Sequence, residues 1–95
     1  PMNAEVNNNL AWLLLTAQEK TIRNPERALT LARTAILLKE SGYILDTLAN
    51  AYWANGLVEE AVATELKAIR LDPDNRAYYQ GQLEKFREQR WQDKE

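Results

Sequence analysis

The sequence predicts an all-α protein of about five helices packed in antiparallel pairs. Apolar residues recur at helical spacing along most of the 95 residues. Helix-breaking residues are few and stand between these stretches, chiefly Pro25, Gly42, Gly56 and Pro73. The second half of the chain also repeats the pattern of the first, which is typical of stacked helix pairs.

Residues 4–18 are predicted to form the first helix, with Asn3 as its N-cap. The apolar stripe that should face the paired helix consists of Val6, Leu10, Leu13, Leu14 and Ala17. Asparagine has low helix propensity, so the run of asparagines at 7–9 is a weak helix start. Trp12 and Leu15 lie off the stripe, and we expect something other than the paired helix to cover them.

A polar loop over residues 19–25 should lead into a second helix over residues 26–40. Asn24 is a good N-cap for this helix. Pro25 suits the first helical position, where a missing N–H costs nothing. We expect Gly42 to end the second helix.

The strongest pattern lies between Leu45 and Pro73. A third helix is indicated by residues at i, i+3, i+4 and i+7, which are Leu45, Leu48, Ala49 and Tyr52. Gly56 should end this helix with positive φ. In the fourth helix, Ala61 and Ala68 are small where neighbouring helices must approach, and Pro73 stops the helix.

This stretch resembles the tetratricopeptide repeat (TPR), a helix–turn–helix unit in which Trp-x-x-Leu-Gly-x-x-Tyr precedes Ala-x-x-x-Phe and a terminal Pro. By this resemblance, residues 42–74 are identified as one TPR. Glu65 departs from the family pattern because it stands at the usual Phe position. The resemblance implies a right-handed superhelical stack, or solenoid, of antiparallel helix pairs.

Residues 4–41 look like a degenerate TPR with a lengthened inner loop. A shift of 38 residues lays Leu10 on Leu48, whereas a shift of 33 lays Ala28 on Ala61. The difference corresponds to five extra residues in the turn of the first repeat. The two halves of the chain are therefore interpreted as two versions of one unit.

Residues 75–91 are predicted to form a C-terminal capping helix, and residues 92–95 a frayed tail. A further step of 34 residues lays Tyr79 on Leu45, and it places Phe86 on the aromatic position of the motif. The helix then becomes polar. That is expected of the last helix in a stack, which has no neighbour to bury its outer face.

The composition narrows the classes of function. Cysteine and histidine are absent, which removes disulfides, thiolate metal sites and the commonest catalytic base. Twelve basic and fourteen acidic residues are mixed along the chain, so no basic surface for a phosphate backbone is indicated. The longest apolar stretch is too short to span a membrane, and no targeting segment is recognisable. We therefore expect no enzyme activity, cofactor or metal, no nucleic acid partner and no membrane insertion.

Three acids of the fourth helix, Glu59, Glu60 and Glu65, could be proposed as paired acids for hydrolysis. They have no partner base, and they lie near the start of a helix, where the helix dipole favours negative charge. We therefore interpret all three as solvated or dipole-stabilising residues.

The TPR resemblance implies that the first helices of successive repeats line a concave groove for an extended peptide or a partner's helix. The candidate groove residues in this register are Trp12, Leu15, Tyr43, Asp46, Asn50, Trp53, Glu84 and Arg87, with Glu5 and Asn8 in the same row. Trp53 and Trp12 are the candidate anchors, because aromatic side chains carry much of the binding energy at interfaces. Packing against a neighbouring helix is the alternative for both. Asn50 could bond a ligand backbone or stay solvated, and Arg87 alone is too little positive charge for a carboxylate ligand.

The resemblance thus implies a protein-interaction scaffold for a protein or peptide partner. The alternative is a structural module that forms a homo-oligomer or docks onto its own longer chain, through Trp12, Leu15 and the first helix. No pattern of residues in the sequence identifies the partner.

Overall fold

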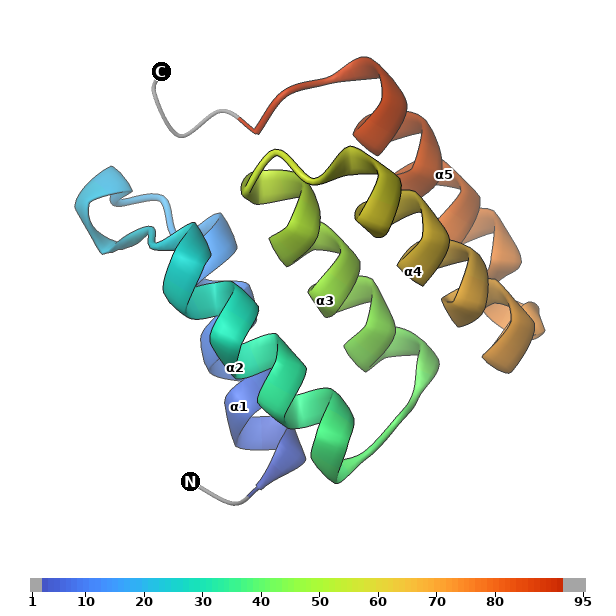
Figure 1. The fold of residues 1–95 in the computed structure, drawn as a ribbon, viewed down its shortest axis with the longest axis horizontal. Helices are drawn as coiled ribbons and strands as arrows, with labels where there is room; N and C mark the ends of the chain where they lie inside the picture. Colours follow the sequence, from blue (N-terminus) through green and yellow to red (C-terminus); the bar gives the residue numbers. More distant parts are fainter. Residues whose placement is uncertain (1–2, 92–95) are drawn as a thin grey trace.

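The computed structural model describes residues 3–91, and these form an all-helical fold without strands (Figure 1). The helices are α1 (Ala4–Thr16), α2 (Pro25–Leu38), α3 (Gly42–Ala54), α4 (Val58–Leu71) and α5 (Arg76–Glu88), with short 3-10 turns η1 (Lys20–Ile22) and η2 (Pro73–Asn75). The prediction of five helices is confirmed, with ends that differ by up to three residues from those expected. The predicted frayed tail, 92–95, lies outside the described residues.

The helices pack in chain order, each against the next. In addition, α3 contacts both α1 and α5, so that α1, α3 and α5 form one layer and α2 and α4 the other. In the view of Figure 1, α1 lies behind α2. The resulting slab measures 35 × 34 × 19 Å between Cα atoms, and one of its faces is built from three helices.

Side-chain caps fix the starts of the first three α-helices. Asn3, Asn24 and Ser41 each accept a hydrogen bond from the backbone N–H three residues later, at 3.0, 3.1 and 3.4 Å. Each cap satisfies one of the N–H groups that a helix start leaves unpaired. The caps at Asn3 and Asn24 and the place of Pro25 at the start of α2 confirm the prediction.

Gly42 begins a helix, so the prediction that it ends the second helix is wrong: α2 stops at Leu38, and Gly42 is the first residue of α3. Glycine is needed at this position because the backbone there lies close to Asp72 and Tyr79. A Cβ added to Gly42 would lie 2.6 Å from the Cβ of Asp72 and 2.7 Å from the Tyr79 hydroxyl. Within residues 3–91, positive φ occurs only at Gly56, which follows α3 as predicted, with φ 81°.

Replacing Gly42 with Ala is expected to lower the free energy of unfolding by about 1–3 kcal/mol, because the Asp72 Cβ sits next to backbone and cannot move aside cheaply. Gly81→Ala is the matched control. Gly81 lies within α5 with nothing near its added Cβ, so its replacement should stabilise the protein by up to about 1 kcal/mol. Urea denaturation measures both changes. Equal stability of the two variants would show that α3 and the end of α4 are not in contact.

The core is built on small residues at the helix contacts. The fully inaccessible alanines are Ala11, Ala28, Ala32, Ala35, Ala49, Ala51, Ala61 and Ala68. Around Ala68 pack Leu45 of α3 and Tyr79 of α5, and around Ala49 and Ala61 packs the ring of Phe86. The alanines allow neighbouring helices to approach closely, and the larger rings from α5 fill the space that remains beside them.

The buried face of α1 differs from the predicted stripe. Val6 and Leu13 are about half exposed, whereas Leu15 is 5% exposed and joins the core with Ala11 and Leu14. The physical reason is that α1 packs against α3 as well as α2, which turns its buried arc toward α3.

The asparagine run is helical throughout, because α1 begins at Ala4. Asn7 and Asn8 are buried, and the Asn7 side-chain amide donates to the backbone carbonyl of Asn3 at 2.8 Å. Tertiary packing thus outweighs the low helix propensity of asparagine here.

Candidate functional site

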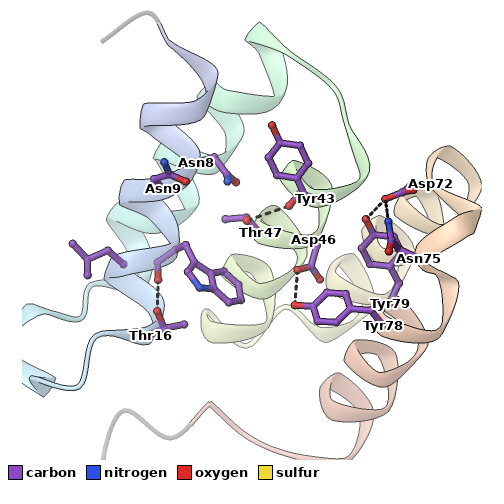
Figure 2. A pocket seen from close by; sticks show the side chains of 12 residues that line it. Asn8, Asn9, Thr16, Tyr43, Asp46, Thr47, Asp72, Asn75, Tyr78 and Tyr79 are labelled. Atoms are coloured by element: carbon purple, nitrogen blue, oxygen red, sulfur yellow. Dashed lines mark hydrogen bonds between the residues drawn. The ribbon is translucent and has the colours of Figure 1, made fainter.

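A pocket of about 740 Å³ opens on the layer made by α1, α3 and α5, and Figure 2 shows it from close by. We call it the α1/α3/α5 pocket. It is lined by Asn8, Asn9, Trp12, Leu13 and Thr16 of α1, by Tyr43, Asp46 and Thr47 of α3, and by Asp72, Asn75, Tyr78 and Tyr79 from the end of α4 to the first turn of α5. Its volume lies within the range of about 300–1,000 Å³ that is usual for ligand sites.

Helical spacing explains why these side chains converge. Asn8, Trp12 and Thr16 recur every fourth residue along α1, and so do Tyr43 and Thr47 along α3, which puts each set on one face of its helix. The two threonine hydroxyls bond back to their own helices. Thr16 donates to the carbonyl of Trp12 at 2.8 Å, and Thr47 to that of Tyr43 at 3.2 Å.

Asp46 links α3 to α5 at the pocket wall, where it is only 5% exposed. Its carboxylate accepts hydrogen bonds from the Tyr78 hydroxyl at 3.3 Å, from the Gln82 amide at 3.1 Å and from the Asn50 amide at 3.4 Å. Charge-assisted bonds of this kind are stronger than neutral ones. Asp46 therefore holds the first turns of α5 in place as well as lining the pocket.

Glu65 of α4 is fully buried beside Asp46, so its interpretation as a solvated or dipole-stabilising residue is wrong. Burial, together with the Asp46 carboxylate, raises the pKa of Glu65 to about 10. Glu65 is then a neutral acid at pH 7 and can donate its proton to Asp46. Within the described residues no N–H or O–H donor reaches either Glu65 oxygen, so no hydrogen bond there stabilises a negative charge on this carboxyl group. Glu59 and Glu60 are exposed in the first turn of α4.

Asp72, which follows α4, also lines the pocket. It accepts a hydrogen bond from the Tyr79 hydroxyl at 2.6 Å and one from the Asn75 amide at 2.9 Å. These two bonds lower the pKa of the Asp72 carboxyl, the Tyr79 bond having the larger effect. Asp72 is therefore a carboxylate at neutral pH.

Asn50 is buried and uses its amide inside the protein. Its Nδ2 donates to the carbonyl of Asp46 at 2.8 Å, and its Oδ1 accepts from Lys85 Nζ at 2.7 Å. Burial lowers the pKa of Lys85, whereas the charge of Asp46 opposes that effect. Asn50 thus ties α3 to α5 and is not among the residues that line the pocket.

Trp53 and Leu15 do not line the pocket. The chain after α5 runs back across the end of α3 (Figure 1). The Trp53 ring packs on Phe86 with 5.7 Å between ring centroids, and its Nε1 donates to the Gln89 carbonyl at 3.0 Å. The Nε1 of Trp91 donates to the carbonyl of Leu15 at 3.3 Å. The segment that follows α5 therefore bonds to both α3 and α1.

The structure brings Trp12, Tyr43 and Asp46 of the candidate groove residues together in the pocket. Glu84 and Arg87 are exposed on α5 but do not line it. Lining residues outside that candidate set include Thr16, Thr47 and Tyr78. For the threonines a usable signal existed, since each follows a candidate residue by one helical turn. The place of Tyr78 depends on the path of the chain through η2.

Comparison with protein-family models, curated proteins and solved structures gave no match. Within the described part of the chain, no group of three or more His, Cys, Asp or Glu is placed to hold a metal ion. None of the helices in residues 3–91 has the length and apolar character needed to cross a membrane. The side chains that line the pocket are aromatic rings, amides, hydroxyls, two carboxylates and the apolar side chain of Leu13.

Proposed function

We propose that the protein is an interaction scaffold that binds an extended peptide or a helix of a partner protein across the α1/α3/α5 pocket. The observation that carries this proposal is the convergence of three aromatic side chains from three helices, Trp12, Tyr43 and Tyr78, on one concave site. Tyr43 and Tyr78 are about half exposed and keep a polar tip beside an apolar ring. Such side chains are the usual anchors of protein interfaces.

We further propose that the chain is a TPR array of two repeats, 4–41 and 42–74, followed by the capping helix 75–91. The paired packing of α1 with α2 and of α3 with α4 supports this, as do the buried alanines at the helix contacts. In TPR arrays the first helices of successive repeats line the concave groove. The helices in that position here are α1, α3 and α5, and they are the helices that carry the pocket.

A binding function suits these side chains better than catalysis. The buried acids Asp46 and Glu65 sit at helix contacts, and Asp46 is already engaged by three side-chain donors. Neither acid is placed beside a histidine or cysteine, since the chain contains none. Asp46 and Glu65 therefore act as packing groups in this proposal.

The exposed side of α1 favours a second candidate, which is docking onto a longer chain or onto a second copy. Val6 is 47% exposed on this terminal helix of the stack, and Leu13, which also lines the pocket, is 50% exposed. Light scattering across a hundredfold dilution separates the two candidates. A constant monomer mass leaves the pocket free for a foreign partner, whereas a dimer that dissociates on dilution favours self-association.

Replacing Trp12 with Ala is expected to weaken binding of a partner peptide about thirtyfold or more, as for other anchor residues. Peptides selected from a random display library on the wild-type protein serve as probes, and calorimetry measures their affinity. Leu37→Ala is the matched control, because Leu37 is 87% exposed on α2, away from the pocket. Loss of helicity in the Trp12 variant must be excluded by circular dichroism. Equal affinity of the two variants would place the binding surface elsewhere.

A further inference from the structure

We propose that the α1/α3/α5 pocket receives a positively charged side chain of the bound segment, arginine in preference to lysine. This inference rests on the proposed function, because it names the chemistry of the residue that a bound partner peptide places in the pocket. Three features of the pocket carry it: the direction of its hydrogen bonds, an unpaired buried oxygen, and its charge.

The pocket wall presents acceptors because its hydroxyls already donate within the protein. The donating hydroxyls are those of Thr16, Thr47, Tyr43, Tyr78 and Tyr79, and the groups that accept from them are the carbonyls of Trp12 and Tyr43 and the carboxylates of Glu5, Asp46 and Asp72. A hydroxyl that has used its proton keeps lone pairs for an incoming N–H group. The pocket therefore suits a ligand rich in donors.

Asn8 adds an acceptor that has no donor. The side chain is only 6% exposed, and its Oδ1 has no hydrogen-bond partner in the described part of the chain. Figure 2 shows this amide pointing from α1 toward the space between α1 and α3. A buried oxygen without a donor is unfavourable, so an N–H group that a ligand directs at it gains more than it would at the surface.

The charge of the lining favours a cation. Asp46 and Asp72 both line the pocket, whereas no Lys or Arg is among its lining residues. Two bases lie nearby and are engaged: Lys39 forms an exposed ion pair at 3.4 Å, and Lys85 bonds a buried amide at 2.7 Å. An entering cation thus meets carboxylates, and an anion would be repelled.

Arginine matches this wall better than lysine does. The rings of Trp12, Tyr43 and Tyr78 line the same space as the acceptors. A guanidinium is planar, can stack on such rings and carries five donors with no acceptor, whereas an ammonium is compact and strongly hydrated. The planar group can lie flat on a ring face while its N–H groups point outward to several oxygens, whereas an ammonium donates from a single nitrogen.

The test begins with selection of random peptides on the wild-type protein, followed by synthesis of the best binder in three forms. Arginine should be enriched at one position. Lysine at that position should lower affinity several-fold, and citrulline, which keeps the shape but loses the charge, about tenfold or more. Equal affinity of the arginine and citrulline peptides would overturn the inference.

A protein variant tests the same contact from the other side. Asn8→Leu removes the unpaired oxygen at similar volume, so the melting temperature should hold or rise while affinity for the arginine peptide falls about fivefold or more. Unchanged affinity of this folded variant would contradict the assigned role of Asn8. If the selected peptides are neutral or acidic and still depend on Trp12, the proposed function stands and the preference for a cation is wrong. If no selected peptide depends on Trp12, both fail.

Discussion

Replacing Phe86 with Ala is expected to lower the free energy of unfolding by about 3–5 kcal/mol. Phe86 is 1% exposed, and its ring fills the space between Ala49 of α3 and Ala61 of α4. It also packs against the Trp53 ring. Because alanine side chains cannot extend into the space that the ring leaves, most of the cavity should persist, and a cavity adds to the lost transfer free energy.

Urea denaturation followed by circular dichroism at 222 nm, a standard helix signal, measures this loss. Domains are typically stable by about 5–15 kcal/mol, so Phe86→Ala removes a large share of the total. Leu37→Ala, at a site 87% exposed, should change stability by less than about 0.5 kcal/mol. A Phe86 variant as stable as the Leu37 variant would mean that α5 does not pack on α3 and α4.

The second large effect concerns the pH dependence of stability. The free energy of unfolding should fall as the pH rises from about 5 to 8, and Glu65→Gln should abolish most of that fall. The pKa of Glu65 is about 10 in the folded protein, against an ordinary value of 4.5. Between these values the folded state keeps a proton that the unfolded state has released. Each pH unit then favours the unfolded state by up to about 1.4 kcal/mol. The stabilising contribution is complete below pH 4.5 and is lost as the pH approaches 10.

Other groups with shifted pKa values act outside this window or with the opposite sign. The pKa values of Glu5 and Asp72 are lowered, mainly by tyrosine hydrogen bonds, so the stability they add is lost only in acid. Burial raises the pKa of Tyr78 to about 12, which matters in strong alkali. Burial lowers the pKa of Lys85, which makes stability rise with pH. Comparison with Glu65→Gln isolates the contribution of Glu65.

Unfolding free energies at pH 5, 6.5 and 8 test the prediction. At pH 5 the two proteins should be similarly stable, because a neutral amide replaces a neutral acid and can still donate to Asp46. At pH 8 the Gln variant should be the more stable by a few kcal/mol, with about 4 kcal/mol as the limit for one proton over three pH units. Parallel pH profiles would show that Glu65 is ionised in the folded protein.

The local features of the fold could be predicted from the sequence. The helices follow from apolar spacing, the caps from Asn3 and Asn24, and the turn after α3 from Gly56. Each depends on residues within one or two turns of the chain. The prediction that Gly42 ends the second helix was wrong, because glycine is required there by contact with Asp72, thirty residues away in sequence. The buried face of α1 was also predicted wrongly, because packing against α3, a later helix, determines which residues of α1 are buried.

The candidate site was predictable only in part. Helix register places Trp12 and Tyr43 in the pocket. Asn50 and Trp53 share that register, yet Lys85 and the carbonyl of Gln89, both from α5 or just beyond it, engage them. No local pattern specifies such long-range contacts. Glu65 did carry a signal of burial through the resemblance to the TPR, because the resemblance aligns it with a position that is usually apolar.

The central claim is that the α1/α3/α5 pocket is the partner-binding surface, and amide NMR spectra during titration with a selected peptide test it most directly. We expect chemical-shift changes to concentrate on the residues that line the pocket, including Trp12, Tyr43, Thr47 and Tyr78. Shift changes confined to the outer surface of α2 and α4, around Leu37 and Leu66, would contradict the claim.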